Sequence, residues 1–176
     1  MKKVKGILAS FILITSVLSC SSNDDEANLS NNCGDFKEQT AQGNFRGKSF
    51  TVKGGTYKKV FDDYSFTLFI YEETSGDPCF VPQFNEGQDV INITLSSAEP
   101  QSITISNTGQ SGTDMLSFIR TTQDSNGASI DSELSECGTI EIISVDSTTK
   151  ALKGRVVAKG VQGSEINGNF TLQLCE

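Results

Sequence analysis

The sequence predicts an all-β fold, an antiparallel β-sandwich (Ig-like or related) of about nine strands. Apolar and polar residues alternate with a period of two along most of the chain, and no window of helical length shows an apolar stripe with a 3.6-residue period. The alternating segments are short and are separated by Gly, Asn and Asp turns, which is typical of sandwiches and small barrels. A small antiparallel β-barrel is the alternative architecture.

Ten segments carry this pattern. The clearest are residues 64–71, 90–95, 115–120, 139–145, 152–158 and 166–174, and weaker ones are 43–46, 49–52, 56–61 and 102–106. In the last strand, Ile166, Phe170 and Leu172 fall on one face and polar residues on the other, so one face is expected to be buried. Residues 64–71 are apolar on both faces, as a central strand would be, and this favours the sandwich.

Turn residues separate the segments. A Gly54-Gly55 pair and an Asp62-Asp63 pair flank the strand expected at 56–61, and Gln162-Gly163-Ser164 precedes the last strand. Gly, Asn and Asp favour turns because they tolerate backbone conformations that other residues avoid.

The N-terminal residues predict export. Lys2, Lys3 and Lys5 precede an uncharged apolar run that ends at Leu18, which is the order of a signal peptide. The run is shorter than the roughly 20 residues that a membrane-spanning helix needs. We expect residues 1–19 to be a signal peptide, residues 20–32 a flexible tether without core-forming side chains, and residues 33–176 a single β-sandwich domain.

Val17-Leu18-Ser19-Cys20 resembles a bacterial lipobox, in which the signal is cut before a cysteine that carries lipid. The resemblance implies lipidation at Cys20 and an anchor in the cell outer membrane. The acidic group at residues 23–26 resembles the tag that sends such lipoproteins to the cell surface, although a plain solvated linker would have the same composition. The expected location is therefore lipid-anchored, at the outer membrane and on the cell surface.

The charge balance excludes one class of partner. Removing residues 1–19 takes away three of the 14 basic residues and none of the 22 acidic residues, which leaves a net charge of −11. Nucleic acid is not an expected partner, because phosphate binding needs clustered Lys and Arg. The net charge also argues against docking on anionic lipid or sulfated glycans, and it favours solubility.

Four cysteines remain after Cys20, namely Cys33, Cys79, Cys137 and Cys175. An even number in an exported chain indicates two disulfides. Of the three possible connectivities, Cys33–Cys175 with Cys79–Cys137 is the preferred one, because Cys137 and Cys175 are expected at opposite ends of a three-stranded C-terminal meander.

The C-terminal third contains Lys153-x-Gly-x-Val156 and Asn167-Gly-x-Phe170, and an early segment reads Gly43-Asn-Phe-Arg-Gly47. In these motifs the chain resembles small lipoproteins of Flavobacteria and other Bacteroidetes, a β-rich group with no assigned activity. The resemblance covers the signal and roughly the last forty residues. It implies a structural likeness and supplies no catalytic residue.

Catalysis is not expected. The chain contains no histidine, which removes Ser-His-Asp and Cys-His catalysis and His-ligated zinc. A glycosidase needs two carboxylates at a fixed separation in one cleft. Neighbours such as Asp62 and Asp63 point to opposite faces of a strand and do not meet that need. We therefore expect a protein that is not an enzyme and needs no cofactor.

Three weaker site hypotheses remain. Asp124, Asn126, Asp131 and Glu133 place oxygen atoms around Gly127 and would suit Ca²⁺, although acidic Asn-Gly segments are usually turns. Tyr57, Phe69 and Tyr71 are candidates for an outward-facing binding surface, against the commoner fate of core packing. The long loop at residues 74–89 is a candidate wall of that surface. Ser147, in Asp146-Ser147-Thr148, fits a pattern for O-glycosylation of exported Bacteroidetes proteins.

These features together predict a non-enzymatic surface lipoprotein whose domain binds a glycan or an envelope protein. The alternative is a structural or assembly accessory lipoprotein without a small-molecule ligand.

Overall fold

The computed structural model describes residues 33–72, 77, 79, 88–106, 114–124 and 127–176, and these residues contain ten strands and no helix. The strands are β1 (Gln42–Phe45), β2 (Lys48–Thr51), β3 (Gly54–Val60), β4 (Asp63–Phe69), β5 (Val90–Leu95), β6 (Gln101–Ser106), β7 (Met115–Asp124), β8 (Gly127–Val145), β9 (Leu152–Gly160) and β10 (Glu165–Leu174). The predicted all-β class is confirmed, and each of the ten expected segments overlaps one of these strands.

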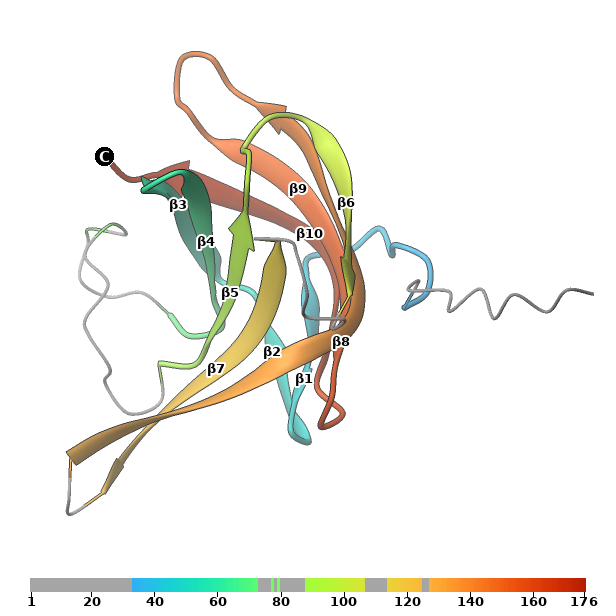
Figure 1. Ribbon diagram of the computed structural model, residues 1–176, viewed down its shortest axis with the longest axis vertical. Helices are drawn as coiled ribbons and strands as arrows, with labels where there is room; N and C mark the ends of the chain where they lie inside the picture. Colours follow the sequence, from blue (N-terminus) through green and yellow to red (C-terminus); the bar gives the residue numbers. More distant parts are fainter. Residues whose placement is uncertain (1–32, 73–76, 78, 80–87, 107–113, 125–126) are drawn as a thin grey trace, which may run out of the picture.

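The strands form one sheet folded into two facing layers, as in a sandwich (Figure 1). One layer has the order β2-β1-β10-β9-β8-β6, and the other has the order β3-β4-β5-β7-β8. All these pairings are antiparallel. A short parallel pairing, of Gln173 with Thr56 and of Leu174 with Tyr57, joins β10 of the first layer to β3 of the second.

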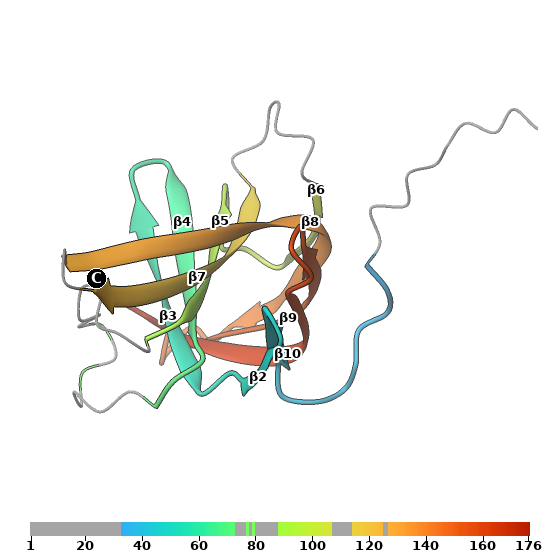
Figure 2. The same ribbon diagram turned by 90° about the horizontal axis from the view of Figure 1, so that it is seen from below.

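Strand β8 belongs to both layers. Its first half pairs with β7 as far as Leu134, and its second half pairs with β6 and β9. The register with β9 shifts between Ser135 and Cys137, where a bulge bends the strand from one layer into the other. Figure 2 shows β8 sweeping across the molecule and turning at one side into the layer of β9 and β10.

The core lies between the layers and follows the alternation of the strands. In β10, Ile166, Phe170 and Leu172 are buried while their neighbours are more exposed, as predicted. The opposite layer supplies side chains from β4, β5 and β7. Its largest fully buried members are Phe66, Leu68, Ile91, Ile93, Leu95, Leu116 and Phe118.

Two sequence expectations are wrong in detail. Gly54 and Gly55 lie inside β3 rather than in a turn, because Gly55 packs against β4: a Cβ atom there would come within 2.3 Å of the Thr67 carbonyl oxygen. In addition, β7 and β8 run further than expected. They continue as a paired arm, from the pair Thr121/Ile130 to the pair Asp124/Gly127, so most of the stretch at residues 121–138, which the predicted strands leave out, is strand.

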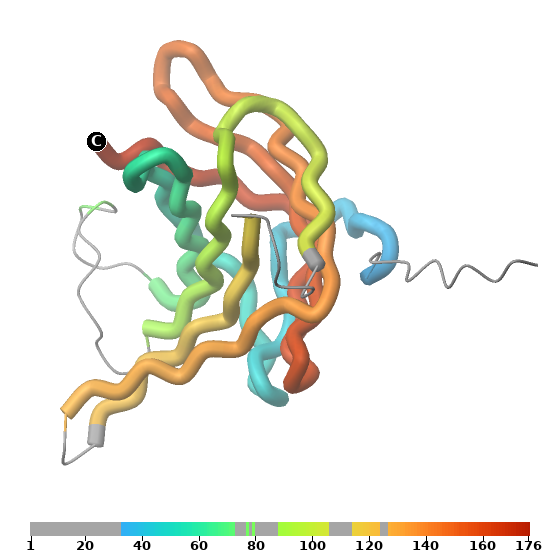
Figure 3. Tube along the Cα trace, viewed as in Figure 1, coloured from blue at the N-terminus to red at the C-terminus, as the bar shows by residue number. Residues whose placement is uncertain are grey.

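Residues 33–41 lie against β10 before the chain enters β1 (Figure 3). The Ala41 amide donates to the Asn169 carbonyl at 2.8 Å, and the Asn169 amide donates to the Gln39 carbonyl at 2.7 Å. The guanidinium of Arg155, on β9, lies 4.3 Å from the centre of the Phe36 ring. These contacts attach the N-terminal segment to the outside of the β9–β10 layer.

Two disulfides join distant parts of the chain, but with a different connectivity from the one expected. Cys33 pairs with Cys137, and Cys79 pairs with Cys175. Cys137 and Cys175 do lie at opposite ends of the β8–β9–β10 meander, since Cys137 pairs with Lys159 near the start of β10. The N-terminal segment, however, enters at the Cys137 end, so Cys33 reaches Cys137 and not Cys175.

Peptide mapping without reduction should find Cys33 linked to Cys137 and Cys79 linked to Cys175, because the four residues fall on different tryptic peptides. Each bridge closes about 100 residues, so replacing either pair by serine should lower the free energy of unfolding by about 4 kcal/mol. Denaturant titration of the two double variants measures this. A peptide joining Cys33 to Cys175 would contradict the assignment.

Candidate binding site at the β1–β2 hairpin

The β1–β2 hairpin has a two-residue turn formed by Arg46 and Gly47. Phe45 pairs with Lys48 across it, and both turn residues have positive φ, 48° at Arg46 and 83° at Gly47. Positive φ at both positions gives the turn a twist that matches the strands, and glycine adopts it without strain. The Gly47 amide donates to Asn44 Oδ1 at 3.2 Å. Arginine is unusual in this conformation, so its side chain must compensate for the strain.

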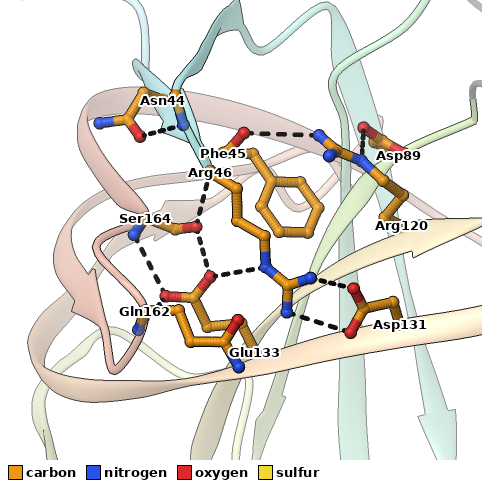
Figure 4. Close-up of polar contacts among 10 residues, drawn as sticks. Asn44, Phe45, Arg46, Asp89, Arg120, Asp131, Glu133, Gln162 and Ser164 are labelled. Carbon is orange, nitrogen blue, oxygen red and sulfur yellow. Dashed lines mark hydrogen bonds and ion pairs between the residues drawn. The ribbon is translucent and has the colours of Figure 1, made fainter.

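The side chain of Arg46 is held by two carboxylates of β8 (Figure 4). Its terminal nitrogens bind both oxygens of Asp131, one of them at 3.0 Å, in a bidentate pair. Its Nε lies 3.5 Å from Glu133 Oε2. The hairpin tip is thereby fixed to a strand 85 residues away in sequence. Bidentate arginine–carboxylate pairs fix orientation as well as distance.

Glu133 is the buried centre of this cluster, with its side chain fully shielded from solvent. It accepts hydrogen bonds from the amides of Gln162 at 2.6 Å and Ser164 at 3.1 Å, and from the Ser164 hydroxyl at 2.5 Å. Burial raises the pKa of Glu133, but these hydrogen bonds and the Arg46 guanidinium outweigh it, and the pKa lies below its ordinary value. Glu133 is therefore an ionised, structural carboxylate.

A second ion pair, between Arg120 and Asp89, also contacts the hairpin. Arg120, on β7, binds Asp89 with Nε 3.0 Å from Oδ2, and its other end approaches the Phe45 carbonyl oxygen at 3.4 Å. The guanidinium lies 4.4 Å from the centre of the buried Phe45 ring, a cation–π contact. Figure 4 shows Phe45 between the side chains of Arg46 and Arg120. The hairpin is thus attached to both layers of the fold.

A cleft of about 1020 Å³ surrounds the β1–β2 hairpin. Its walls come from residues 33–39, both strands of the hairpin, the adjacent ends of β9 and β10, and Ile70, Asp89 and Arg120 of the other layer. The basic residues that line it are Lys37, Lys48, Lys53, Arg120 and Lys159. They are five of the 11 basic residues that follow residue 19, whereas only three of the 22 acidic residues, Asp35, Asp89 and Glu165, line the same cleft. The cleft therefore reverses the sign of the chain's overall charge.

The predicted aromatic surface is wrong. Tyr57 is 4% exposed, its ring stacks on Phe66, and its hydroxyl donates to the Lys150 carbonyl at 2.7 Å. Phe69 is 2% exposed and lies on the opposite face of the layer, because β3 pairs Tyr57 with Phe66. Only Tyr71 retains partial exposure, with its ring 5.4 Å from that of Phe69. The three residues do not form one face.

The structure does not support the predicted calcium site either. The carboxylates of Asp131 and Glu133 are engaged by Arg46, and Glu133 by Ser164 as well. Asp124 lies at the end of β7, and Asn126 lies outside the described residues. Within the described ranges, no three Cys, Asp or Glu side chains are grouped as a metal site requires.

The remaining predicted sites lie elsewhere. Ser147 is exposed in the β8–β9 turn, where Asp146 Oδ1 accepts from the amides of Thr148 and Thr149. Those two hydrogen bonds lower the pKa of Asp146. The turn leaves the Ser147 side chain open to solvent, and its glycosylation stays a prediction. Cys20 lies outside the described residues, as does most of the long loop at residues 74–89.

The residues that build this site were not singled out from the sequence. Arg46, Asp89 and Arg120 carry no local signature, since each forms its ion pair with a residue at least 31 positions away. The one available signal was the Gly43-Asn-Phe-Arg-Gly47 motif, which proves to be the hairpin itself. The sequence predicts Asp131 and Glu133 as calcium ligands and not as partners of an arginine.

Comparison of the chain with protein-family models, with curated proteins and with solved structures gives no match. No helix among the residues that the structure describes is long and apolar enough to cross a membrane. What the site does must therefore be argued from its geometry.

Gly160 provides a test of the Glu133 cluster. A Cβ atom at this position would lie 2.2 Å from Glu133 Oε1, the oxygen that accepts from Gln162 and Ser164. Gly160→Ala should therefore break these hydrogen bonds and lower the free energy of unfolding by about 2–3 kcal/mol. Chemical denaturation measures the change.

Gly54→Ala is the matched control, because a Cβ atom there meets nothing within 4 Å. In a Glu133→Ala background, Gly160→Ala should lower the free energy of unfolding only slightly, because Glu133 Oε1, the atom that the added Cβ would meet, is absent. An equal loss of unfolding free energy in both backgrounds would show that the Gly160→Ala substitution does not act through the Glu133 cluster.

Proposed function

We propose that this chain is a non-enzymatic envelope lipoprotein, anchored through Cys20 on the outer face of the outer membrane, whose β-sandwich is a binding module for an envelope protein or a glycan. The signal-like N-terminus and the lipobox resemblance support the anchor. Two disulfides in the folded part suit an oxidising compartment.

The cleft at the β1–β2 hairpin is the observation that carries the binding role. It combines a large concave surface with a locally basic lining in a strongly acidic chain. Its walls are held by the Arg46 and Arg120 ion pairs, so the surface is formed before a ligand arrives. A preformed concave site with a few directed polar groups is the usual form of a binding site.

The same cleft gives no support to catalysis. Its acidic side chains are Asp35, Asp89 and Glu165, and Asp89 is paired with Arg120. The role proposed for these groups is to position the hairpin and set the local charge. An activity in the purified protein against envelope polymers would overturn this part of the proposal.

Between the two partner classes, the geometry favours a protein. Sugar recognition commonly uses exposed aromatic rings, and the predicted ones, Tyr57 and Phe69, are buried. Two aromatic residues line the cleft, Phe45, which is buried, and Phe50, which is half-buried.

The anchor is tested with the intact gene expressed in a Bacteroidetes host. Mass spectrometry of the mature protein should find an acylated N-terminal Cys20, and Cys20→Ser should release the protein from the membrane fraction, because the acyl chains supply the membrane affinity. External protease should cleave the wild type on intact cells. An unprocessed N-terminus would contradict the anchor.

The binding role is tested by placing a photo-crosslinking amino acid in the protein on living cells. A probe at Thr51, which lines the cleft, should give a discrete crosslinked partner, whereas a probe at Lys58, which is exposed on β3 and outside the cleft, should not. Equal crosslinking at both positions, or none at either together with an empty glycan array, would favour the structural accessory role.

A further inference from the structure

We infer that the β1–β2 hairpin receives its partner by strand addition, with an extended, acidic peptide segment pairing along the free edge of β2. This inference rests on the proposed function and specifies the partner of that same cleft. It follows from three features of β2: its unpaired backbone, its place in the cleft and the charges at its two ends.

The backbone of β2 is paired on one side only. In the hairpin, hydrogen-bonded residue pairs alternate with pairs that are not hydrogen-bonded, and Phe45–Lys48 at the turn is the first bonded pair. The Val52 amide donates to the Ala41 carbonyl at 2.8 Å, which agrees with this alternation. Ser49 and Thr51 fall between the bonded pairs, so their N–H and C=O groups point away from β1. Within the described part of the chain, no backbone partner meets them.

The unpaired part of the β2 edge ends at Lys53, just before β3. The Lys53 amide, next in the outward-pointing series, donates to the Phe69 carbonyl at 2.8 Å. The edge is therefore covered at Lys53 and free at Ser49 and Thr51, which offer two donors and two acceptors. Such a row of unsatisfied groups is a template for an added strand.

The free edge opens into the cleft and not onto a flat surface. Ser49, Phe50 and Thr51 line the cleft, with Ile70 and Arg120 across from them. An added strand would lie about 4.8 Å from β2. Its side chains on one face would meet the partly buried Phe50 and Ile70, which supply an apolar contact beside the backbone bonds.

Charge at the ends of β2 selects an acidic segment. Lys48 begins the strand and Lys53 follows it, both exposed, and about 17 Å of extended chain separates them. Lys53 Nζ lies 3.0 Å from Glu72 Oε1, an exposed ion pair that an incoming carboxylate can replace. Carboxylates spaced four or five residues apart on an extended peptide would reach both lysines.

Strand β6 provides a comparison within the same sheet. It too pairs with only one neighbour in the described residues, β8. Exposed Glu136 lies on that neighbour, Glu141 there is paired with Arg155 at 2.7 Å, and β6 does not line the cleft. Strand β6 carries no Lys or Arg that would attract an acidic strand, so β2 is the edge that fits this partner.

The hairpin is rigid enough to act as a template. Arg46 fixes its turn to Asp131 and Glu133, and Arg120 contacts the carbonyl oxygen of Phe45. An edge already held in strand geometry loses less conformational entropy when a peptide binds.

The test uses the chain from residue 21 onward, which keeps every described strand and both disulfides, and a random 12-residue peptide library displayed on phage. Selected peptides should be rich in Asp and Glu and poor in Pro. When a selected peptide is added to the labelled protein, the amides of Ser49 and Thr51 should become at least tenfold more protected from hydrogen exchange. The β6 amides should not change.

Two variants separate strand addition from general charge attraction. Thr51→Pro removes one outward N–H and leaves the bonds to β1, and it should weaken binding at least tenfold. Lys48→Glu/Lys53→Glu should do the same, whereas Lys58→Glu/Lys59→Glu changes the net charge equally outside the cleft and should leave the Kd within twofold. Circular dichroism confirms that each variant is folded.

Several outcomes would overturn the inference. They are the absence of acidic peptides after selection, protection on β6 in place of β2, or equal weakening by both lysine pairs. If crosslinking at Thr51 still captures a partner, the binding role stands and only strand addition fails. If crosslinking fails as well, the proposed function falls with it.

Discussion

The attachment of the β1–β2 hairpin to β8 is the interaction on which the site depends. Among the described strands, β10 is the neighbour that joins this short hairpin to the rest of the sheet, through the pairing of Gln42–Asn44. Arg46 adds a bidentate ion pair with Asp131 and a contact with the buried Glu133, which in turn holds the β9–β10 turn through Ser164. One arginine side chain thus joins three parts of the molecule that are distant in sequence.

Buried ion pairs are weak evidence for stability, because desolvation offsets much of the attraction. Their clearer contribution here is orientation. Arg46 has a backbone conformation that costs a non-glycine residue some free energy. The two carboxylates of β8 and the hydrogen bond from the Arg46 amide to Ser164 Oγ, at 3.1 Å, compensate for it. The hairpin is therefore fixed at one angle to the body of the protein, and the cleft beside it keeps one shape.

The strands were predictable from the sequence, because each buries one face and the alternation records it, most clearly in β10. The arm formed by β7 and β8 was not. Its residues Thr121–Asp124 and Gly127–Ser129 include no large apolar side chain, so nothing distinguished them from a loop. Their pairing continues a strand pair that begins in the body of the protein.

The failures at the site have different physical reasons. A two-residue turn at Phe61-Asp62 joins β3 to β4, so odd-numbered residues of β3 pair with even-numbered residues of β4. Tyr57 and Phe69 are both odd-numbered and therefore face opposite sides of the layer, which the strand pattern alone did not reveal. The ion pairs of Arg46 and Arg120 join residues far apart in the chain, and one sequence contains no record of such contacts. The Cys33–Cys137 bridge escaped prediction because it depends on where the N-terminal segment enters.

That entry point relates the cleft to the proposed anchor. Cys33 lines the cleft and is bound to Cys137, so the chain leaves the folded part at the edge of the site. Twelve residues separate Cys20 from Cys33, and even a fully extended chain over these thirteen Cα-to-Cα steps spans only about 45 Å. If Cys20 carries lipid, a partner bound along β2 is held within that distance of the bilayer. Such a module suits partners that are themselves at the membrane surface, where confinement to the same layer raises their effective concentration and lets a four-bond edge with modest intrinsic affinity be occupied.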